Sequence, residues 1–128
     1  MTSMMICLFI AILLPIVSKA PLAMAMNREG GYNNRYPRQQ QAKLTGFGAR
    51  ARAAHENAFE ALIMFAPALL AAVVTQQTGD LAQTLAITFV VARIAYLVCY
   101  LADIHWLRSL VWAAGYLCTL GLAILAIS

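Results

Sequence analysis

The chain has 128 residues, of which 62% are hydrophobic and only 11% are charged, and its net charge is +4. A soluble domain is about half apolar and about a quarter charged, so this composition excludes a soluble globular protein. A helix needs roughly 20 mostly apolar residues to cross a bilayer. Four stretches meet this need, near residues 4–26, 56–75, 83–102 and 107–127. The sequence therefore predicts an all-α integral membrane protein with one four-helix transmembrane domain over residues 1–128.

The positive charges are unevenly distributed along the chain. Most of the Lys and Arg residues lie between the first and second apolar stretches, whereas residues 76–82 contain none. Cytoplasmic loops are enriched in Lys and Arg, so loops one and three are predicted to be cytoplasmic and both termini to lie on the opposite side. The basic first loop lacks the interleaved aromatic residues of a nucleic-acid site, and no nucleic-acid partner is predicted.

The first apolar stretch, residues 4–26, is expected to remain as a membrane helix. Residues 23–25 resemble a signal-peptide cleavage site, but the first three residues carry no positive charge and Lys19 lies late in the apolar run. Pro15 predicts a kink or local weakening near the middle of the helix. The long Lys19 side chain is expected to extend to the cytoplasmic interface, or alternatively to help attract an anionic ligand.

Residues 27–49 are predicted to form the longest loop. They contain two consecutive glycines, two consecutive asparagines and Pro37, all of which are typical of turns and loops. The second helix is expected to begin near residue 45, before the bilayer, and to continue to residue 75. Its first turns are polar, and Pro67 predicts a kink within its apolar part.

The second helix carries a row of polar side chains at its start. Residues three and four apart lie on the same face of a helix, so Arg50, Asn57 and Glu60 are predicted to line up along one face. A polar row that enters a bilayer is costly and indicates a functional site. His55 is expected to be an interfacial residue, because neither histidine nor cysteine spacing supports a metal site, and no metal is predicted.

The third and fourth helices carry a second set of polar side chains. Arg93, Tyr96 and Tyr100 are spaced by three and four residues, and Arg108 and Ser109 open the fourth helix. An arginine beside the free N–H groups of a helix start makes an anion site. If the anion is a thiolate, the same field lowers its pKa and activates it, and the serine can add a hydrogen bond.

The two sets together suit a small, zwitterionic ligand that is rich in carboxylates. Arginines bind carboxylates, whereas Glu60 can bind an ammonium and Asn57 an amide. Three structural interpretations compete with this one. Glu60 and Arg93 can form a structural ion pair between helices, the two tyrosines can belong to an interfacial aromatic belt, and Arg108 can be a charge that only sets topology.

At these residues the chain resembles the superfamily of membrane-associated proteins in eicosanoid and glutathione metabolism (MAPEG), which includes the microsomal glutathione transferases. The resemblance covers nearly the whole chain and follows the order of the helices. Its motifs are His55-x-Asn57-x-x-Glu60 followed by Phe65, then Arg93-Ile94-Ala95-Tyr96 with Tyr100, then Arg108-Ser109. The segment Asn34-Arg35-Tyr36-Pro37-Arg38 with Leu44-Thr45-Gly46 is similar to the bacterial branch.

The resemblance implies a homotrimer that binds glutathione, as co-substrate or cofactor, between neighbouring subunits near the cytoplasmic face. Asn57 and Glu60 would contact glutathione from the second helix and Tyr100 from the third, while Arg108 would stabilise the thiolate and Arg93 would belong to the same polar interior. Two positions depart from the family pattern. Ala53 stands where many members have an arginine, which Arg50 or Arg52 would replace from nearby, and Tyr96 stands where several members have a histidine.

Three functions follow as hypotheses. The first is a glutathione transferase or peroxidase that acts on apolar electrophiles or lipid hydroperoxides, which would reach the thiolate from the surrounding membrane lipid. The second is a non-catalytic MAPEG-like protein with a structural or lipid-binding role. The third is a small four-helix transporter. Small multidrug transporters depend on a glutamate in their first helix, but here that stretch has Lys19 and no carboxylate, which disfavours transport.

Overall fold

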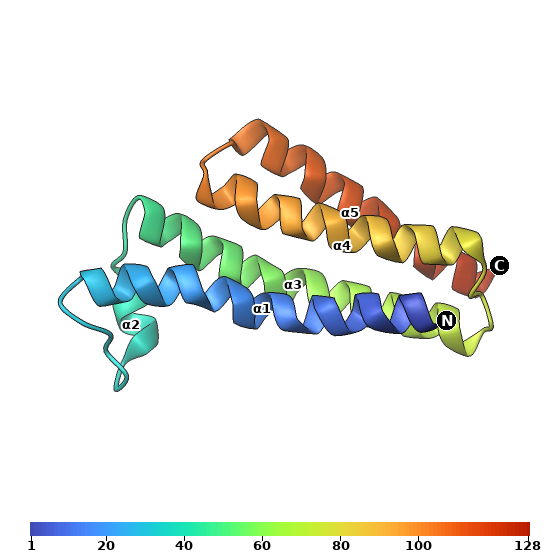
Figure 1. Cartoon of the computed structure of the whole chain (residues 1–128), viewed down its shortest axis with the longest axis horizontal. Helices are drawn as coiled ribbons and strands as arrows, with labels where there is room; N and C mark the ends of the chain where they lie inside the picture. The colour runs from blue at the N-terminus through green and yellow to red at the C-terminus, as the bar shows by residue number, and fades with distance from the viewer.

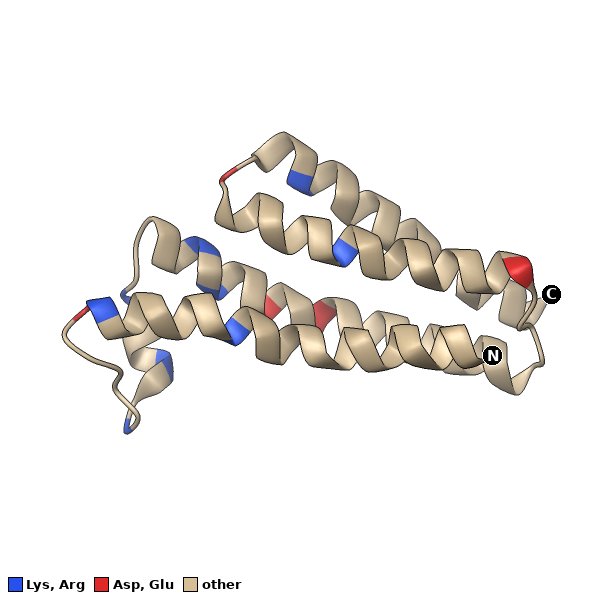
Figure 2. Cartoon of the chain, in the orientation of Figure 1, with Lys and Arg blue, Asp and Glu red and all other residues tan.

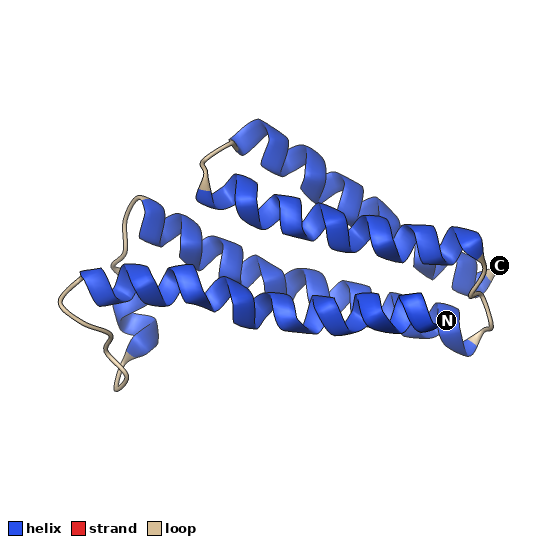
Figure 3. Cartoon of the chain, viewed as in Figure 1, coloured by secondary structure: helices blue, strands red, loops and turns tan.

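The computed structural model describes all 128 residues, and it contains helices and no strands (Figure 3). The helices are α1 (Thr2–Arg28), α2 (Pro37–Ala42), α3 (Phe47–Val74), α4 (Asp80–Leu101) and α5 (His105–Ile127). All except α2 are long and apolar enough to cross a membrane. The predicted all-α membrane bundle of four long helices is confirmed.

The four long helices form two antiparallel pairs (Figure 1). In one pair α1 packs on α3, and in the other α4 packs on α5. The pairs converge at the end of the bundle that holds both termini and diverge toward the opposite end (Figure 1). We call that opposite end, which holds residues 29–46 and 102–104, the basic end.

The main hydrophobic core lies in the half of the bundle near the termini. All four long helices contribute to it, and Phe65 of α3 stacks on Phe89 of α4 with 3.7 Å between ring centroids. Toward the basic end the core is much smaller, and it is built around Leu22, Met26 and Ala51 from α1 and α3. Asn57 of α3 and Arg93 of α4 therefore lie on the basic-end side of the main core, where they contact each other across the two helix pairs.

The first loop contains a helix that the sequence analysis did not predict. α2 spans Pro37–Ala42 and begins with Pro37, which suits the first turn of a helix because its missing N–H has no partner there anyway. The Gln40 amide group donates to the carbonyls of Met26 and Gly31, at 3.0 and 2.9 Å, and its oxygen accepts from the Asn33 N–H. This one side chain ties α2 to the end of α1. From the sequence alone, Pro37 indicates only a turn.

The prolines inside the long helices do not divide them. α1 stays helical through Pro15 and Pro21, and α3 stays helical through Pro67. Proline is tolerated within membrane helices where neighbouring elements compensate for the lost hydrogen bond.

Figure 2 shows that most lysines and arginines gather toward the basic end. Asp80 begins α4 and therefore lies at the opposite end of the bundle. The chain is thus a multi-pass membrane protein with a strongly asymmetric charge distribution. The prediction that the basic end is cytoplasmic follows from this asymmetry and the positive-inside rule.

Candidate functional site

Arg93 lies at the centre of the polar residues and joins the two predicted sets. Its side chain is buried, with an exposed fraction of 5%, on the face of α4 that meets the other helices. One guanidinium nitrogen, Nη2, donates to the Asn57 Oδ1 of α3 at 2.8 Å. A cation within the span is costly unless it is paired or hydrogen-bonded, so this contact helps to hold Arg93 in place.

Contacts continue from Arg93 along α4 to the start of α5. The Arg93 guanidinium lies over the Tyr96 ring at 4.1 Å, and Tyr96 meets Tyr100 edge to face at 5.5 Å. The Arg108 guanidinium of α5 lies over the Tyr100 ring at 4.4 Å. A cation over an aromatic face is attracted by the ring quadrupole. Asn57, Arg93, Tyr96, Tyr100 and Arg108 thus form one continuous series of contacts across three helices, which we call the polar series.

A hollow of about 220 Å³ lies at the α5 end of the polar series. It is lined by Tyr96, Tyr100, Arg108, Ser109 and Trp112, and we call it the Arg108 hollow. Four of these residues were expected from the sequence, whereas Trp112 was not. Trp112 follows Arg108 by four residues, so the spacing rule that found the other rows would have placed it on the same face.

Ser109 is committed to its own helix in this structure. Its hydroxyl donates to the His105 carbonyl at 3.2 Å, which is the ordinary bond of a serine to the preceding helical turn. The hydroxyl must rotate away from this carbonyl before it can donate a hydrogen bond to a sulfur in the hollow.

The remaining predicted residues of α3 do not join the polar series. Glu60 is exposed and forms no ion pair, so the structural pairing of Glu60 with Arg93 is wrong. The ion pair of the chain joins Arg52 and Glu56 at 2.9 Å, four residues apart on an exposed surface. Arg50 is half-buried, and its Nε atom is buried without any hydrogen-bond partner. The two arginines that precede Ala53 in sequence therefore differ, because Arg52 is paired and Arg50 is not.

His55 connects α3 to α1 and lies away from the Arg108 hollow. Its Nδ1 atom is 3.1 Å from the Ser18 hydroxyl oxygen, and its ring meets Phe59 edge to face. His55 also borders a second hollow, of about 200 Å³, between α1, α2 and α3. Lys19 and Arg38 line this second hollow, which shares no lining residue with the Arg108 hollow.

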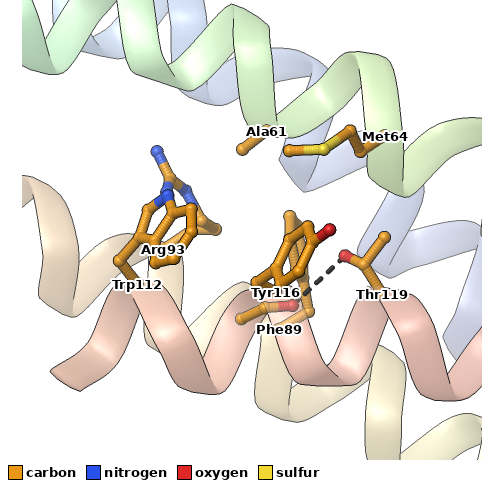
Figure 4. A pocket seen from close by; sticks show the side chains of 8 residues that line it. Ala61, Met64, Phe89, Arg93, Trp112, Tyr116 and Thr119 are labelled. Carbon is orange, nitrogen blue, oxygen red and sulfur yellow. Dashed lines mark hydrogen bonds between the residues drawn. The ribbon is translucent and has the colours of Figure 1, made fainter. Parts of the chain in front are cut away.

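Arg93 and Trp112 also border a small cavity between α3, α4 and α5 (Figure 4). Ala61 and Met64 of α3 border it on one side, and Tyr116 and Thr119 of α5 border it on the other. The Thr119 hydroxyl donates to the Gly115 carbonyl at 3.2 Å, so this polar group is satisfied within its helix. The polar series therefore ends against an apolar interior.

A bundle of four apolar helices that carries a buried arginine and a cationic hollow near one end is a membrane protein with a polar site inside its span. The MAPEG family model matches residues 3–128, and the chain belongs to this family. No curated protein and no solved structure shows a significant match to the chain.

Proposed function

We propose that this MAPEG protein is a membrane-bound, glutathione-dependent transferase or peroxidase. In this proposal it activates the glutathione thiolate for attack on apolar electrophiles or lipid hydroperoxides. The observation that carries the proposal is the position of Arg108, which lies over Tyr100 in a hollow beside the first turn of α5. A guanidinium and a helix N-terminus both attract an anion, and both lower the pKa of a thiol bound beside them.

The groups around the polar series match the functional groups of glutathione. That tripeptide carries two carboxylates, one ammonium and two amides besides its thiol. Arg50 and Arg93 suit the carboxylates, and the exposed Glu60 suits the ammonium. Asn57 uses its oxygen for Arg93, so its NH₂ group is left to donate to a peptide carbonyl.

The proposal includes a homotrimer, with glutathione bound between neighbouring copies. Arg50 and Glu60 lie outside the Arg108 hollow, and Glu60 is exposed on α3. A charged side chain exposed within a membrane span requires a polar surrounding, which a ligand and a neighbouring subunit would supply. In a single chain the glutathione site would be open on this side.

Two reactions fit an activated thiolate in this place. In a transfer, the sulfur forms a bond to an electrophilic carbon, and the leaving group departs with its electron pair. In a peroxidase reaction, the sulfur attacks the terminal oxygen of a hydroperoxide, the O–O bond breaks, and the alkoxide takes up a proton. A second glutathione then reacts with the resulting sulfenic acid to give the disulfide and water.

The test is the ultraviolet absorbance of the thiolate when glutathione is added to the detergent-solubilised protein at neutral pH. We expect a saturable increase, together with a higher Tm, because a ligand that binds only the folded state stabilises it. The control is the analogue in which a methyl group replaces the thiol; it should raise the Tm without the absorbance. If glutathione produces neither an absorbance change nor thermal protection, the proposal is refuted.

Arg50 and Arg52 provide a matched pair that tests which arginine replaces the one missing at residue 53. We expect Arg50→Leu to weaken glutathione binding by about ten- to a hundredfold, because a charge-assisted hydrogen bond contributes roughly 1.5–3 kcal/mol. Arg52→Leu should change it less than about twofold, since its exposed pair with Glu56 is worth about 0.3–0.5 kcal/mol. Calorimetric titration measures both constants. An equal loss in the two variants would contradict the assignment of Arg50.

A further inference from the structure

Trp112 has a position that an interfacial membrane anchor would not have. It lines the small cavity behind Arg93 (Figure 4). It also lines the Arg108 hollow, so this one side chain borders both spaces. The other tryptophan, Trp106, lines neither space, as expected for a residue of the aromatic belt. Trp106 is 61% exposed and Trp112 is 41% exposed, so the difference between them lies in what their rings border. Trp112 therefore belongs to the site rather than to the lipid-facing surface alone.

The plane of the Trp112 ring is fixed by its neighbour on α5. Its indole stacks nearly parallel on the Tyr116 ring, with 5.4 Å between centroids and 5° between planes. This is the offset geometry that aromatic pairs prefer. A large side chain that is partly exposed on a helix would otherwise sample several rotamers, so the stack holds a flat surface at the edge of the Arg108 hollow.

Trp112 also differs from the two tyrosines that share the hollow. Arg93 lies over Tyr96 and Arg108 lies over Tyr100, so each tyrosine already offers a ring face to a cation. No lysine or arginine lies over the Trp112 ring. Of the three aromatic rings that line the hollow, the electron-rich Trp112 indole is thus the one with no cation over its face. It lies one helical turn from Arg108.

We infer that Trp112 is a specificity-determining residue that binds planar, electron-poor aromatic electrophiles by ring stacking. It thereby favours such substrates over aliphatic ones. The inference rests on the proposed function, because the thiolate beside Arg108 is the nucleophile. With an aromatic chloride, a C–S bond forms at the ring carbon, and chloride leaves with the electron pair of the C–Cl bond. No further reactant is needed.

Kinetics with two substrates test the specificity. The ratio of kcat/KM for chlorodinitrobenzene to kcat/KM for nonenal, an aliphatic electrophile, should fall about two- to tenfold in Trp112→Leu, the range that an aromatic pair contributes. Trp112→Phe should retain most of the ratio, because phenylalanine keeps a ring at this place. If Trp112→Leu slows both substrates equally, Trp112 only fills space and the inference is wrong.

A binding measurement without glutathione separates this inference from the proposed function. The chain has two tryptophans, so Trp106→Phe leaves Trp112 as the one indole fluorophore. Dinitrobenzene, which has no leaving chloride, should quench this fluorescence saturably, whereas the matched variant Trp112→Phe should show only linear quenching of Trp106. Linear quenching in both variants would overturn the stacking site. Saturable quenching of Trp112 in a protein that never activates glutathione would support the stacking site and refute the proposed function.

Discussion

Replacing Arg108 with alanine is expected to lower glutathione turnover by about a hundred- to a thousandfold, the loss that follows removal of one group that stabilises developing negative charge. The fold should persist. Arg108 is half-buried, and its contact with the Tyr100 ring is worth roughly 0.5–1 kcal/mol at such a site. The measurements are kcat at saturating glutathione, the thiolate absorbance and the Tm of the same preparation.

Two further variants make the Arg108 result specific. Arg108→Lys keeps the charge but loses the planar fork of the guanidinium, so its turnover should lie between wild type and Arg108→Ala. Arg38→Ala removes an arginine that is also near the basic end but lines the other hollow, and its turnover should stay near that of wild type. If Arg108→Ala retains both its fold and its turnover, Arg108 serves only topology, and the thiolate is stabilised elsewhere.

The helices could be predicted because each depends on a property that is local in the sequence. An apolar run of membrane length has no stable alternative to a helix in a bilayer, so α1, α3, α4 and α5 follow directly from composition. α2 was missed because Pro37 is compatible with two local structures. A proline marks a turn, but it also suits the first position of a helix, and only the bonds made by Gln40 decide between them.

Helical spacing predicts which residues share one face of a helix, and the site could be predicted only to that extent. Spacing placed Arg93, Tyr96 and Tyr100 on one face of α4, and the structure joins them. Spacing could not decide whether Arg93 contacts Asn57 or Glu60, because these lie three residues apart on one row of α3 and the choice depends on the offset between two helices. Trp112 was missed because an aromatic residue in a membrane helix is usually attributed to contact with lipid.

Removing the Asn57 oxygen is expected to destabilise the fold more than any other single change in the site. Asn57→Leu leaves the buried Arg93 guanidinium without its hydrogen-bond acceptor, and the free energy of unfolding should fall by about 2–4 kcal/mol. Glu60→Gln, on the same row but exposed and unpaired, should change it by less than about 0.5 kcal/mol. Equilibrium unfolding in mixed micelles gives both values. Similar losses in the two variants would show that the Asn57–Arg93 bond contributes little.

The double variant Asn57→Leu/Arg93→Leu decides whether this contact serves only the fold. With the charge and its acceptor both removed, most of the stability should return. The loss of unfolding free energy in the double variant should therefore be about 2 kcal/mol smaller than the sum of the losses in the two single variants. Glutathione at a hundred times its Kd should stabilise the wild type by about 2.7 kcal/mol. It should give the refolded double variant almost none of this protection, because two groups of the proposed site are missing. A stable double variant that glutathione still protects fully would make the Asn57–Arg93 bond purely structural, and the carboxylate of the ligand would then have to bind at Arg50 alone.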